Sequence, residues 1–508
     1  MSIPKKCNGT LIFSALFSVV AAAMAAANDQ PQWGELFSRN MISNETGLPD
    51  TLDPALKNNI KWSVHLGTTT HSTPIVSGGK VFIGTNNETP RDPHHVGDRG
   101  VLMCLDEKDG SLIWQLTVPK LEDDPFLDWP KMGMCSPVTV EGDRVYVVSN
   151  RGEVMCLDTN GLANGNDGPY QDEAKHMTPR NAPAEEAGKT DADIIWLFDM
   201  PAEIKIHTHD SAHCSILIDG NYLYVNTGNG VDSTHRRIRA PDAPSLIVLD
   251  KRTGKLVAQD GELIGPRIFH CTWSSPSIGE VNGQRLVFYG GGDGICYAFE
   301  AVKEPLPKEL PMTLKRVWRY DSDPTAPKEN VHQFQGNKTV SPSNITGMPV
   351  FLNGRIYLTA GGDTFQGKAQ SWLKCIDASK TGDITPSGEI WSYPLSGHSM
   401  CTPAIRDGLI YVTDTSGKIH CVDAETGKPY WVHETKAEMW GSVLLADGKL
   451  YASTRKGSFW VLAAGKEKKL ISTVQLGGNG TSGTPTAANG IVYVATMTTL
   501  YALKKSAE

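Results

Sequence analysis

One pattern of apolar and polar positions recurs along most of the chain. A small residue, often followed by proline, precedes a short apolar stretch and a glycine turn; a Val- and Tyr-rich stretch comes next, then one ending in Leu-Asp-x-x-x-Gly, and then one with tryptophan. The second stretch is clearest at Lys80–Ile83 and Arg144–Val147, where β-branched and aromatic residues alternate. Alternation with a period of two predicts pleated strands, so each unit predicts four short strands.

Eight copies of this unit can be placed. Their first strands are expected to begin near Thr73, Ser136, Ser215, Ser275, Met348, Thr402, Ser442 and Thr484. Radial repetition at such a period predicts an all-β fold, an eight-bladed β-propeller of four-stranded antiparallel blades. The last copy stops one strand short, and Lys61–Leu66 has the look of the missing tryptophan strand. We therefore expect the N-terminal strand to close the ring.

Three regions are expected along the chain: a signal peptide at residues 1–27, a leader segment at residues 28–59 and the propeller at residues 60–504. Lys5 and Lys6 precede an apolar run from Leu11 to Val20, and alanines precede Asn28, which is typical of a cleavable secretory signal. No later segment has the roughly 20 apolar residues of a membrane helix. These features predict a periplasmic or secreted protein with no membrane span.

Charge and cysteine content narrow the possible partners. The formal net charge is −8 and becomes more negative when the two lysines of the signal are removed, so nucleic acid is not an expected partner. Four cysteines are expected to begin inner strands near the channel, where they could pair across blades or touch a ligand: Cys135, Cys214, Cys271 and Cys401.

The repeat resembles that of the pyrroloquinoline-quinone-type (PQQ-like) β-propellers. The resemblance rests on Ala/Cys-Leu-Asp-x-x-Thr-Gly-Lys-x-x-Trp, as in Cys421–Trp431, and extends from about Trp62 to Leu503. That family includes quinoprotein alcohol dehydrogenases and the outer-membrane β-barrel assembly lipoprotein. The leader, with Gln32–Gly34 and Asn44–Pro49, resembles that of planctomycete-type exported members. Fold is implied more strongly than function.

The sequence lacks several cofactor-binding features of the dehydrogenases in that family. A quinoprotein dehydrogenase would add adjacent cysteines, a calcium site and a tryptophan beneath the quinone. Trp273 could take the stacking role, but the sequence has no Cys-Cys pair and calcium ligands cannot be mapped onto it. These departures argue against bound PQQ, whereas a metal ion stays possible. The lipoprotein's acylated cysteine is missing as well.

The propeller topology predicts which face carries the site. Loops joining the second and third strands share a face with the links between blades, and nearly all long insertions fall there. Ten of the 14 histidines map to this face: His71, His94, His95, His207, His209, His213, His235, His270, His332 and His398. Binding groups concentrate on loops held by a rigid scaffold. We expect the functional site at this face, around the mouth of the central channel.

Two kinds of site are candidates on that face. The metal-ligand candidates are His207, His209, Asp210 and His213, because imidazole and carboxylate groups bind zinc or copper. Structural hydrogen bonding is the alternative reading. Asp92, His94, His95, Asp98 and Arg99 form a second candidate cluster.

The cofactor-binding candidates are Trp273, Arg236, Arg237, Arg267 and His270. Forked guanidinium groups suit carboxylates, sulfates or phosphates, although salt bridges to loop aspartates would explain the same arginines.

Two functions follow from these observations. The first is an exported binding or scaffold module that takes an unknown protein, glycan or small anionic ligand through its His/Arg-rich face. The second is a metal- or quinone-dependent periplasmic oxidoreductase with its site at the channel mouth. The sequence names no catalytic residue and does not decide whether the protein is an enzyme.

Overall fold

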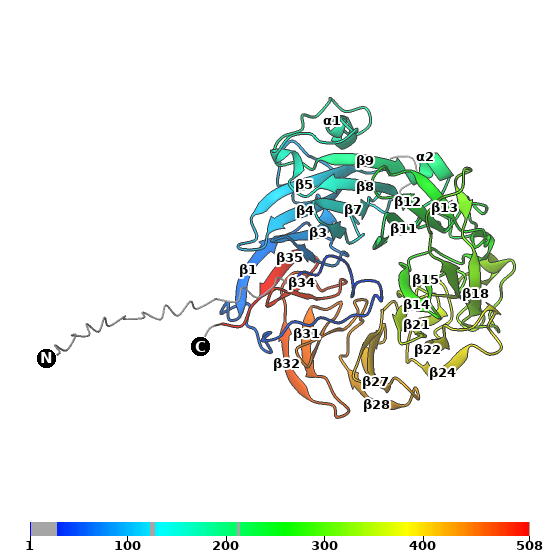
Figure 1. Ribbon diagram of the computed structural model, residues 1–508. Helices are drawn as coiled ribbons and strands as arrows, with labels where there is room; N and C mark the ends of the chain where they lie inside the picture. The colour runs from blue at the N-terminus through cyan, green and yellow to red at the C-terminus, as the bar shows by residue number, and fades with distance from the viewer. Residues whose placement is uncertain (2–27, 122–127, 211–213, 507–508) are drawn as a thin grey trace.

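Eight small β-sheets are arranged around a central axis in the computed structural model, which describes residue 1 and residues 28–121, 128–210 and 214–506 (Figure 1). Each sheet forms one blade with four antiparallel strands, and three of the sheets have one further short strand. The blades are numbered in the order in which their inner strands occur along the chain. The all-β, eight-bladed propeller predicted from the sequence is confirmed.

The first four blades occupy residues 75–321. Blade 1 consists of β2 (Ile75–Ser77), β3 (Lys80–Asn86), β4 (Arg99–Asp106) and β5 (Leu112–Pro119). Blade 2 consists of β6 (Thr139–Glu141), β7 (Arg144–Val148), β8 (Glu153–Asp158) and β9 (Ile194–Asp199). Blade 3 consists of β10 (Leu217–Asp219), β11 (Tyr222–Asn226), β12 (Leu246–Asp250) and β13 (Leu256–Gln259). Blade 4 consists of β14 (Ser277–Val281), β15 (Gln284–Gly290), β16 (Ile295–Glu300) and β18 (Arg316–Asp321).

The other four blades complete the ring. Blade 5 consists of β20 (Val350–Leu352), β21 (Arg355–Gly362), β22 (Ser371–Asp377) and β24 (Glu389–Pro394). Blade 6 consists of β25 (Ala404–Arg406), β26 (Leu409–Asp414), β27 (Lys418–Asp423) and β28 (Pro429–Glu434). Blade 7 consists of β29 (Leu444–Ala446), β30 (Lys449–Ser453), β31 (Ser458–Ala463) and β32 (Leu470–Gln475). Blade 8 consists of β33 (Thr486–Ala488), β34 (Ile491–Ala495), β35 (Thr499–Leu503) and β1 (Ile60–His65).

Short strands and helices are attached to this ring. The strand β17 (Met312–Thr313) pairs in parallel with the outer strand β13 of blade 3, and β23 (Gly382–Asp383) pairs in parallel with the outer strand β18 of blade 4. The strand β19 (Ser343–Asn344) pairs antiparallel with β21. The helices are α1 (Glu173–Met177) and α2 (Met200–Ile204), with 3-10 turns at Gly161–Ala163, Gly265–Arg267 and Val331–Phe334. In the described part of the chain, no helix is long and apolar enough to cross a membrane.

The expected ring closure is confirmed. Strand β1 pairs antiparallel with β35, so that Trp62 lies opposite Ala502, and the N-terminal strand thereby supplies the outer strand of blade 8. Every blade thus has its four antiparallel strands, and blade 8 packs against blade 1.

The hydrophobic core is divided into eight clusters, one between each pair of neighbouring blades. Phe82 and Trp114 of blade 1, for example, pack with Val145 and Val147 of blade 2, and all four are buried. The last cluster joins blade 8 to blade 1 around Tyr493. Each sheet is therefore buried on both faces, which explains why its strands are apolar at nearly every position.

A tryptophan–glycine contact repeats between blades and accounts for the spacing of the sequence motif. Trp196 donates a hydrogen bond from Nε1 to the carbonyl oxygen of Lys251 in the next blade, at 3.1 Å. Gly254 lies beneath that indole with φ +70°, and a Cβ there would be 2.5 Å from the ring. The motif aspartate holds the same turn, because Asp250 accepts a hydrogen bond from the backbone N–H of Arg252 at 2.9 Å. The repeated tryptophan and aspartate therefore have structural roles at this junction.

The leader segment threads through the middle of the ring, a role that the sequence did not predict (Figure 1). Its backbone bonds to Val76 of blade 1, Val140 of blade 2 and Phe351 of blade 5. Arg39 is fully buried and donates to the backbone oxygens of Ser215 in blade 3 and Pro276 in blade 4. Asn40 and Ser43 continue these contacts to blades 6, 7 and 8. The leader therefore ties all eight blades together.

Two further expectations concern the N-terminal signal peptide and the cysteines. The predicted signal peptide lies outside the described residues, apart from Met1, and its cleavage stays a prediction. All nine described cysteines are buried and free of disulfide bonds. Pairing across neighbouring blades, one of the two roles considered for the inner cysteines, is therefore absent from the described part of the chain.

Candidate functional site

Three loop segments beside blades 3 and 4 are joined by their backbones. They are the link that enters β10, the loop between β11 and β12, and the link that enters β14. Isolated bridges pair Thr208 with Asn229 and Gly230 with Cys271, and the N–H of Val231 donates to the carbonyl of His270 at 2.9 Å. These segments are far apart in sequence, yet their backbone contacts fix them relative to one another.

Gly230 makes this close approach possible. A Cβ at this position would lie 2.7 Å from the Cβ of His209 and 3.1 Å from the sulfur of Cys271. Any side chain would therefore force the segments apart. The glycine lets the first and third segments meet over the second.

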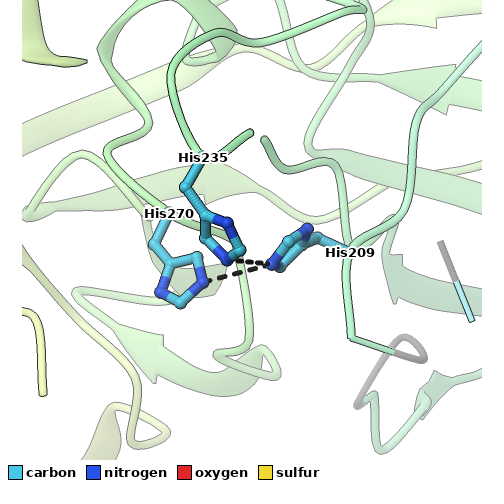
Figure 2. Close-up of side chains that lie close together, drawn as sticks. All are labelled: His209, His235 and His270. Carbon is cyan, nitrogen blue, oxygen red and sulfur yellow. Dashed lines mark hydrogen bonds between the residues drawn. The ribbon is translucent and has the colours of Figure 1, made fainter. Parts of the chain in front are cut away.

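The three segments each contribute one histidine to a compact cluster, the three-histidine centre (Figure 2). Nε2 of His209 lies 3.1 Å from Nε2 of His235 and 3.2 Å from Nε2 of His270. A tetrahedral zinc ion with bonds of about 2.0–2.1 Å to imidazole nitrogens would separate those nitrogens by about 3.3 Å. The observed spacing matches that of nitrogen ligands around one metal ion.

A buried carboxylate orients one of these rings. Nδ1 of His270 donates to Oδ2 of Asp363, the two atoms being 3.1 Å apart. Since an ionised carboxylate only accepts hydrogen bonds, Nδ1 carries the proton and Nε2 presents its lone pair to the cluster. Asp363 is itself fixed by the side chain of Asn344 and by the backbone N–H groups of Phe365 and Gln366. A carboxylate behind a histidine is the usual support of a metal-binding imidazole.

Asp210 lies next to the cluster on its cavity side. Its Oδ1 is 3.5 Å from Nε2 of His209, and its Oδ2 is 3.9 Å from Nε2 of His270. Asp210 also lines the adjoining cavity together with His235 and His270. The carboxylate can therefore complete the coordination of a metal or exchange a proton with a ligand bound there.

The residues of the cluster differ in protonation. Burial, followed by the charges of His270 and His235, lowers the pKa of His209 to about 3. Burial also lowers the pKa of His270, but the charge and hydrogen bond of Asp363 outweigh it and raise that pKa above its ordinary value. Burial raises the pKa of Asp210 to about 6. At neutral pH, His209 is thus neutral and offers a lone pair without releasing a proton.

The cluster opens onto a cavity of about 520 Å³ at the centre of the ring. Loops of several blades contribute to its wall, and Trp33 of the leader contributes from the opposite end of the channel. A volume of this size is typical of small-molecule sites. The aromatic lining residues are His71, Trp129, Trp273, Phe365 and Trp440, in addition to those already named.

The four metal-ligand candidates from the sequence separate in the structure. His209 and Asp210 lie in the cluster. His207 is half-buried and does not belong to the three-histidine group, and its backbone N–H bonds to Asn229. His213 lies outside the described residues.

The five cofactor-binding candidates also separate. His270 and Trp273 lie together on the cavity wall, their ring centres 4.9 Å apart. Arg236 and Arg237 are exposed, and Arg237 pairs with Asp232. Arg267 bonds to Asp293 and Tyr297, away from the cavity. Arg237 and Arg267 thus form the salt bridges to loop aspartates that were the alternative to anion binding.

The second candidate cluster forms ion pairs in place of a convergent ligand set. Nδ1 of His95 lies 2.6 Å from Glu185, and its Nε2 lies 3.2 Å from Asp191. Arg99 pairs with the same Glu185, whereas His94 is exposed and pairs with Asp92. These contacts anchor the insertion at residues 161–192 to blade 1.

Sequence reasoning missed two members of the site. His235 was assigned to the correct face but not to a ligand set, and Asp363 was not singled out. The available signal was the position of His235 in a long insertion on the same face as His209 and His270. Asp363 follows β21 in the equivalent loop of blade 5, and only its contact with His270 reveals its role.

The residues present do not fit a quinone with its calcium ion, the cofactor pair that the resemblance to quinoprotein dehydrogenases implies. Calcium takes oxygen ligands, whereas the group of potential metal ligands within the described residues consists of three imidazoles. The described cysteines are all unpaired, so none forms a disulfide ring beneath a quinone. The donor set suits zinc or copper instead.

Comparisons with known proteins agree with the observed architecture. The family model described as outer membrane protein assembly factor BamB matches residues 98–163 and 315–504, just over half of the chain. No protein of curated function matches the sequence.

Three solved structures are similar over most of their length. BamB from Moraxella catarrhalis is 14% identical with a TM-score of 0.51, covering 88% of this chain and 98% of its own. A europium-containing methanol dehydrogenase is 14% identical with a TM-score of 0.57, covering 92% and 90%. The quinohemoprotein alcohol dehydrogenase ADHIIG from Pseudomonas putida HK5 is 12% identical with a TM-score of 0.56, covering 94% and 81%. At these identities the likeness shows the fold alone. The chain has eight four-stranded blades, and the family model matches just over half of the chain. It therefore belongs to the PQQ-like β-propeller family of the assembly factor BamB.

Proposed function

We propose that the three-histidine centre binds one divalent transition metal ion, zinc or copper, and that the protein is a metal-dependent enzyme acting on a small molecule in the axial cavity. The observation that carries this proposal is the convergence of Nε2 atoms from His209, His235 and His270 at metal-ligand spacing. Three protein ligands leave a fourth position, as in catalytic zinc sites, and the cavity lies beside it.

The surrounding residues have distinct roles in this proposal. Asp363 keeps His270 in the tautomer that presents Nε2 to the metal. Asp210, on the cavity side, would accept a proton from a group held at the fourth position and return it afterwards. Zinc would supply Lewis-acid chemistry there, whereas copper would make the site redox-active and the protein an oxidoreductase.

A binding role without chemistry is the second candidate. It is favoured by the matching family model, whose description names an assembly factor. The exposed Arg236 and Arg237, which follow the cavity-lining His235 in the sequence, would then contact a protein, glycan or small anion. This role needs no firmly retained metal, and metal content therefore separates the two candidates.

The deciding experiment measures the metal content of the protein as purified from an exporting host without chelators. Elemental analysis and native mass spectrometry are expected to give one zinc or copper ion per chain. The triple variant His209→Ala, His235→Ala, His270→Ala is expected to lose the ion. X-ray absorption at the metal edge should show nitrogen ligands at about 2.0–2.1 Å for zinc.

The matched control is His94→Ala, because the side chain of His94 is 84% exposed and lies outside the three-histidine group. It should keep the metal, and circular dichroism should show the same fold in all variants. A wild-type protein without bound metal, or full retention in the triple variant, would overturn the proposal and leave the binding role.

We also propose that the chain is exported and processed near Asn28. The basic start and apolar run of residues 1–27 support this. The intact mass of protein recovered from the exporting host tests it: a mass that includes residues 1–27 would contradict processing.

A further inference from the structure

Eight aromatic rings line the axial cavity, and several of them contact one another. Phe365 meets His270 edge-on, with ring centres 5.8 Å apart, and meets Trp440 in the same way at 6.0 Å. The ring of His71 stacks on Trp440, and Arg455 lies 4.1 Å from the centre of that indole. These contacts hold the rings in place around the cavity. A set of fixed aromatic surfaces favours a flat ligand with a π-system.

Charge on the wall restricts the ligand further. Among the described residues that line the cavity there is no lysine or arginine, and Asp210 is the one carboxylate. A polyanion such as a sugar phosphate would find no cationic side chain on this wall to pair with. With a metal ion in the centre, a cationic ligand would be repelled. The wall therefore fits a ligand that carries no positive charge and presents one group, not several anionic groups, to the metal.

The leader limits how the ligand can enter. Residues 30–43 bond to the inner strands of all eight blades, and Trp33 lines the cavity from that end. The segments with His209 and His270 precede inner strands, the loop with His235 joins β11 to β12 on the same face, and all three lie at the other end. A ligand therefore reaches the metal centre from the loop face, with its ring among the aromatic side chains and one end toward the histidines.

The arrangement of Asp210 indicates which group the ligand presents to the metal. Its carboxylate lies within 3.5 Å of Nε2 of His209 and faces the cavity. A hydroxyl oxygen at the fourth position would bind the metal through its electron pair, and its O–H would donate a hydrogen bond to the carboxylate of Asp210. A phenol-type hydroxyl donates a stronger hydrogen bond to a carboxylate than an aliphatic alcohol does.

Resting on the metal site proposed above, we infer that the axial cavity binds a planar aromatic molecule with one acidic hydroxyl group, a ligand of the phenol or naphthol class. The aromatic rings select the flat ring system, and the fourth coordination position with Asp210 selects the hydroxyl.

Isothermal titration of the zinc-loaded full-length protein with three compounds tests this inference. 2-Naphthol has both features, 2-methoxynaphthalene lacks the proton, and decahydro-2-naphthol lacks the aromatic ring. We expect 2-naphthol to bind at least about tenfold more tightly than either analogue. The preference over 2-methoxynaphthalene should disappear when the metal is removed.

Two pairs of variants place the ligand in the cavity. Trp440→Leu is expected to weaken 2-naphthol binding about tenfold. Tyr430→Leu, which alters a 38% exposed aromatic residue on the outer strand β28, should leave it unchanged. Asp210→Asn should weaken 2-naphthol binding but bind zinc as tightly as the wild type does. Asp363→Asn, in contrast, should weaken zinc binding.

The outcomes separate the two proposals. If zinc is retained but 2-naphthol binds no better than decahydro-2-naphthol, the inferred ligand class is wrong and the metal site stands. Zinc loss in Asp210→Asn would make Asp210 a metal ligand and overturn its role as the hydrogen-bond acceptor for the ligand. A wild-type protein that retains no zinc would refute the metal site itself.

Discussion

Replacing Asp363 by asparagine changes one atom of the site and tests how the three-histidine centre is organised. Oδ1 of Asp363 accepts the backbone N–H groups of Phe365 and Gln366, and Oδ2 accepts Nδ1 of His270. An amide oxygen that keeps the two backbone bonds places its NH₂ group against Nδ1 of His270. That ring must then accept at Nδ1 and carry its proton on Nε2, where the metal would bind.

The expected effect is large because the wrong tautomer blocks one of three ligands. Loss of a carboxylate behind a metal-binding histidine weakens metal binding about 10- to 100-fold. This corresponds to about 1.4–2.7 kcal/mol of binding free energy. Competition between the protein and a chromophoric zinc chelator at pH 7.5 measures the dissociation constant directly. The zinc-induced rise in melting temperature should shrink in parallel.

The pH dependence of zinc binding checks the same interaction. In the wild type, Asp363 raises the pKa of His270, so protons compete with zinc as the pH falls through that raised value. Without the carboxylate, the pKa of His270 falls, and the loss of zinc affinity should begin at a lower pH.

A second buried His–Asp pair provides the control. Oδ2 of Asp414 lies 2.9 Å from Nε2 of His420, and both side chains are buried within blade 6. Asp414→Asn should destabilise the fold to a similar degree without changing zinc affinity. If Asp363→Asn binds zinc as tightly as the wild type does, the orienting role assigned to Asp363 is wrong.

Two further predictions concern the scaffold. Gly254→Ala should lower the free energy of unfolding by about 1–3 kcal/mol more than Gly220→Ala in chemical denaturation. Both glycines have positive φ, but only at Gly254 would a Cβ meet the ring of Trp196, so equal losses would contradict the proposed interblade contact. Glu185→Gln should expose the insertion at residues 161–192 to proteases, because Glu185 holds it to His95. Burial lowers the pKa of His95 and raises that of Glu185, but their hydrogen-bonded partners outweigh burial, so the pKa of His95 is raised and that of Glu185 is lowered overall. The contact is therefore fully stabilising between about pH 4.5 and 6.5, and it weakens as the pH rises through the raised pKa of His95. Protease resistance of the wild type that stays constant up to pH 9 would refute this.

The fold could be predicted almost completely because its determinants are local and repeated. Each blade needs the same alternation, the same aspartate turn and, in most blades, the same tryptophan, so eight weak signals support one interpretation. The predicted closing strand at Lys61–Leu66 followed from counting strands in the last unit, and β1 occupies that place. The leader followed no repeat, and its passage across all eight blades could not be derived from residues 28–59 alone.

The candidate site was predictable only in part, for a physical reason. Topology assigned His209, His235 and His270 to one face, because the direction of each strand fixes the end at which its loop lies. Which side chains meet depends on loop conformation, and here that is set by the backbone contacts around Gly230. Such contacts join residues more than 20 positions apart and leave no periodic trace in the sequence. For the same reason the local cluster around His207 was predicted and its long-range partners were not.

The position of the three-histidine centre bears on whether its metal would be structural or functional. A structural zinc site is usually closed by four protein ligands and replaces missing hydrophobic core. Here the interblade clusters are complete, and the backbones of the three segments are already joined to one another, so the fold does not need a metal to hold these loops. Two of the three histidines, His235 and His270, lie instead on the wall of a cavity that the leader lines at the far end. A ligand set that the scaffold does not need, placed where a small molecule can reach it, is better explained by chemistry on that molecule than by stability.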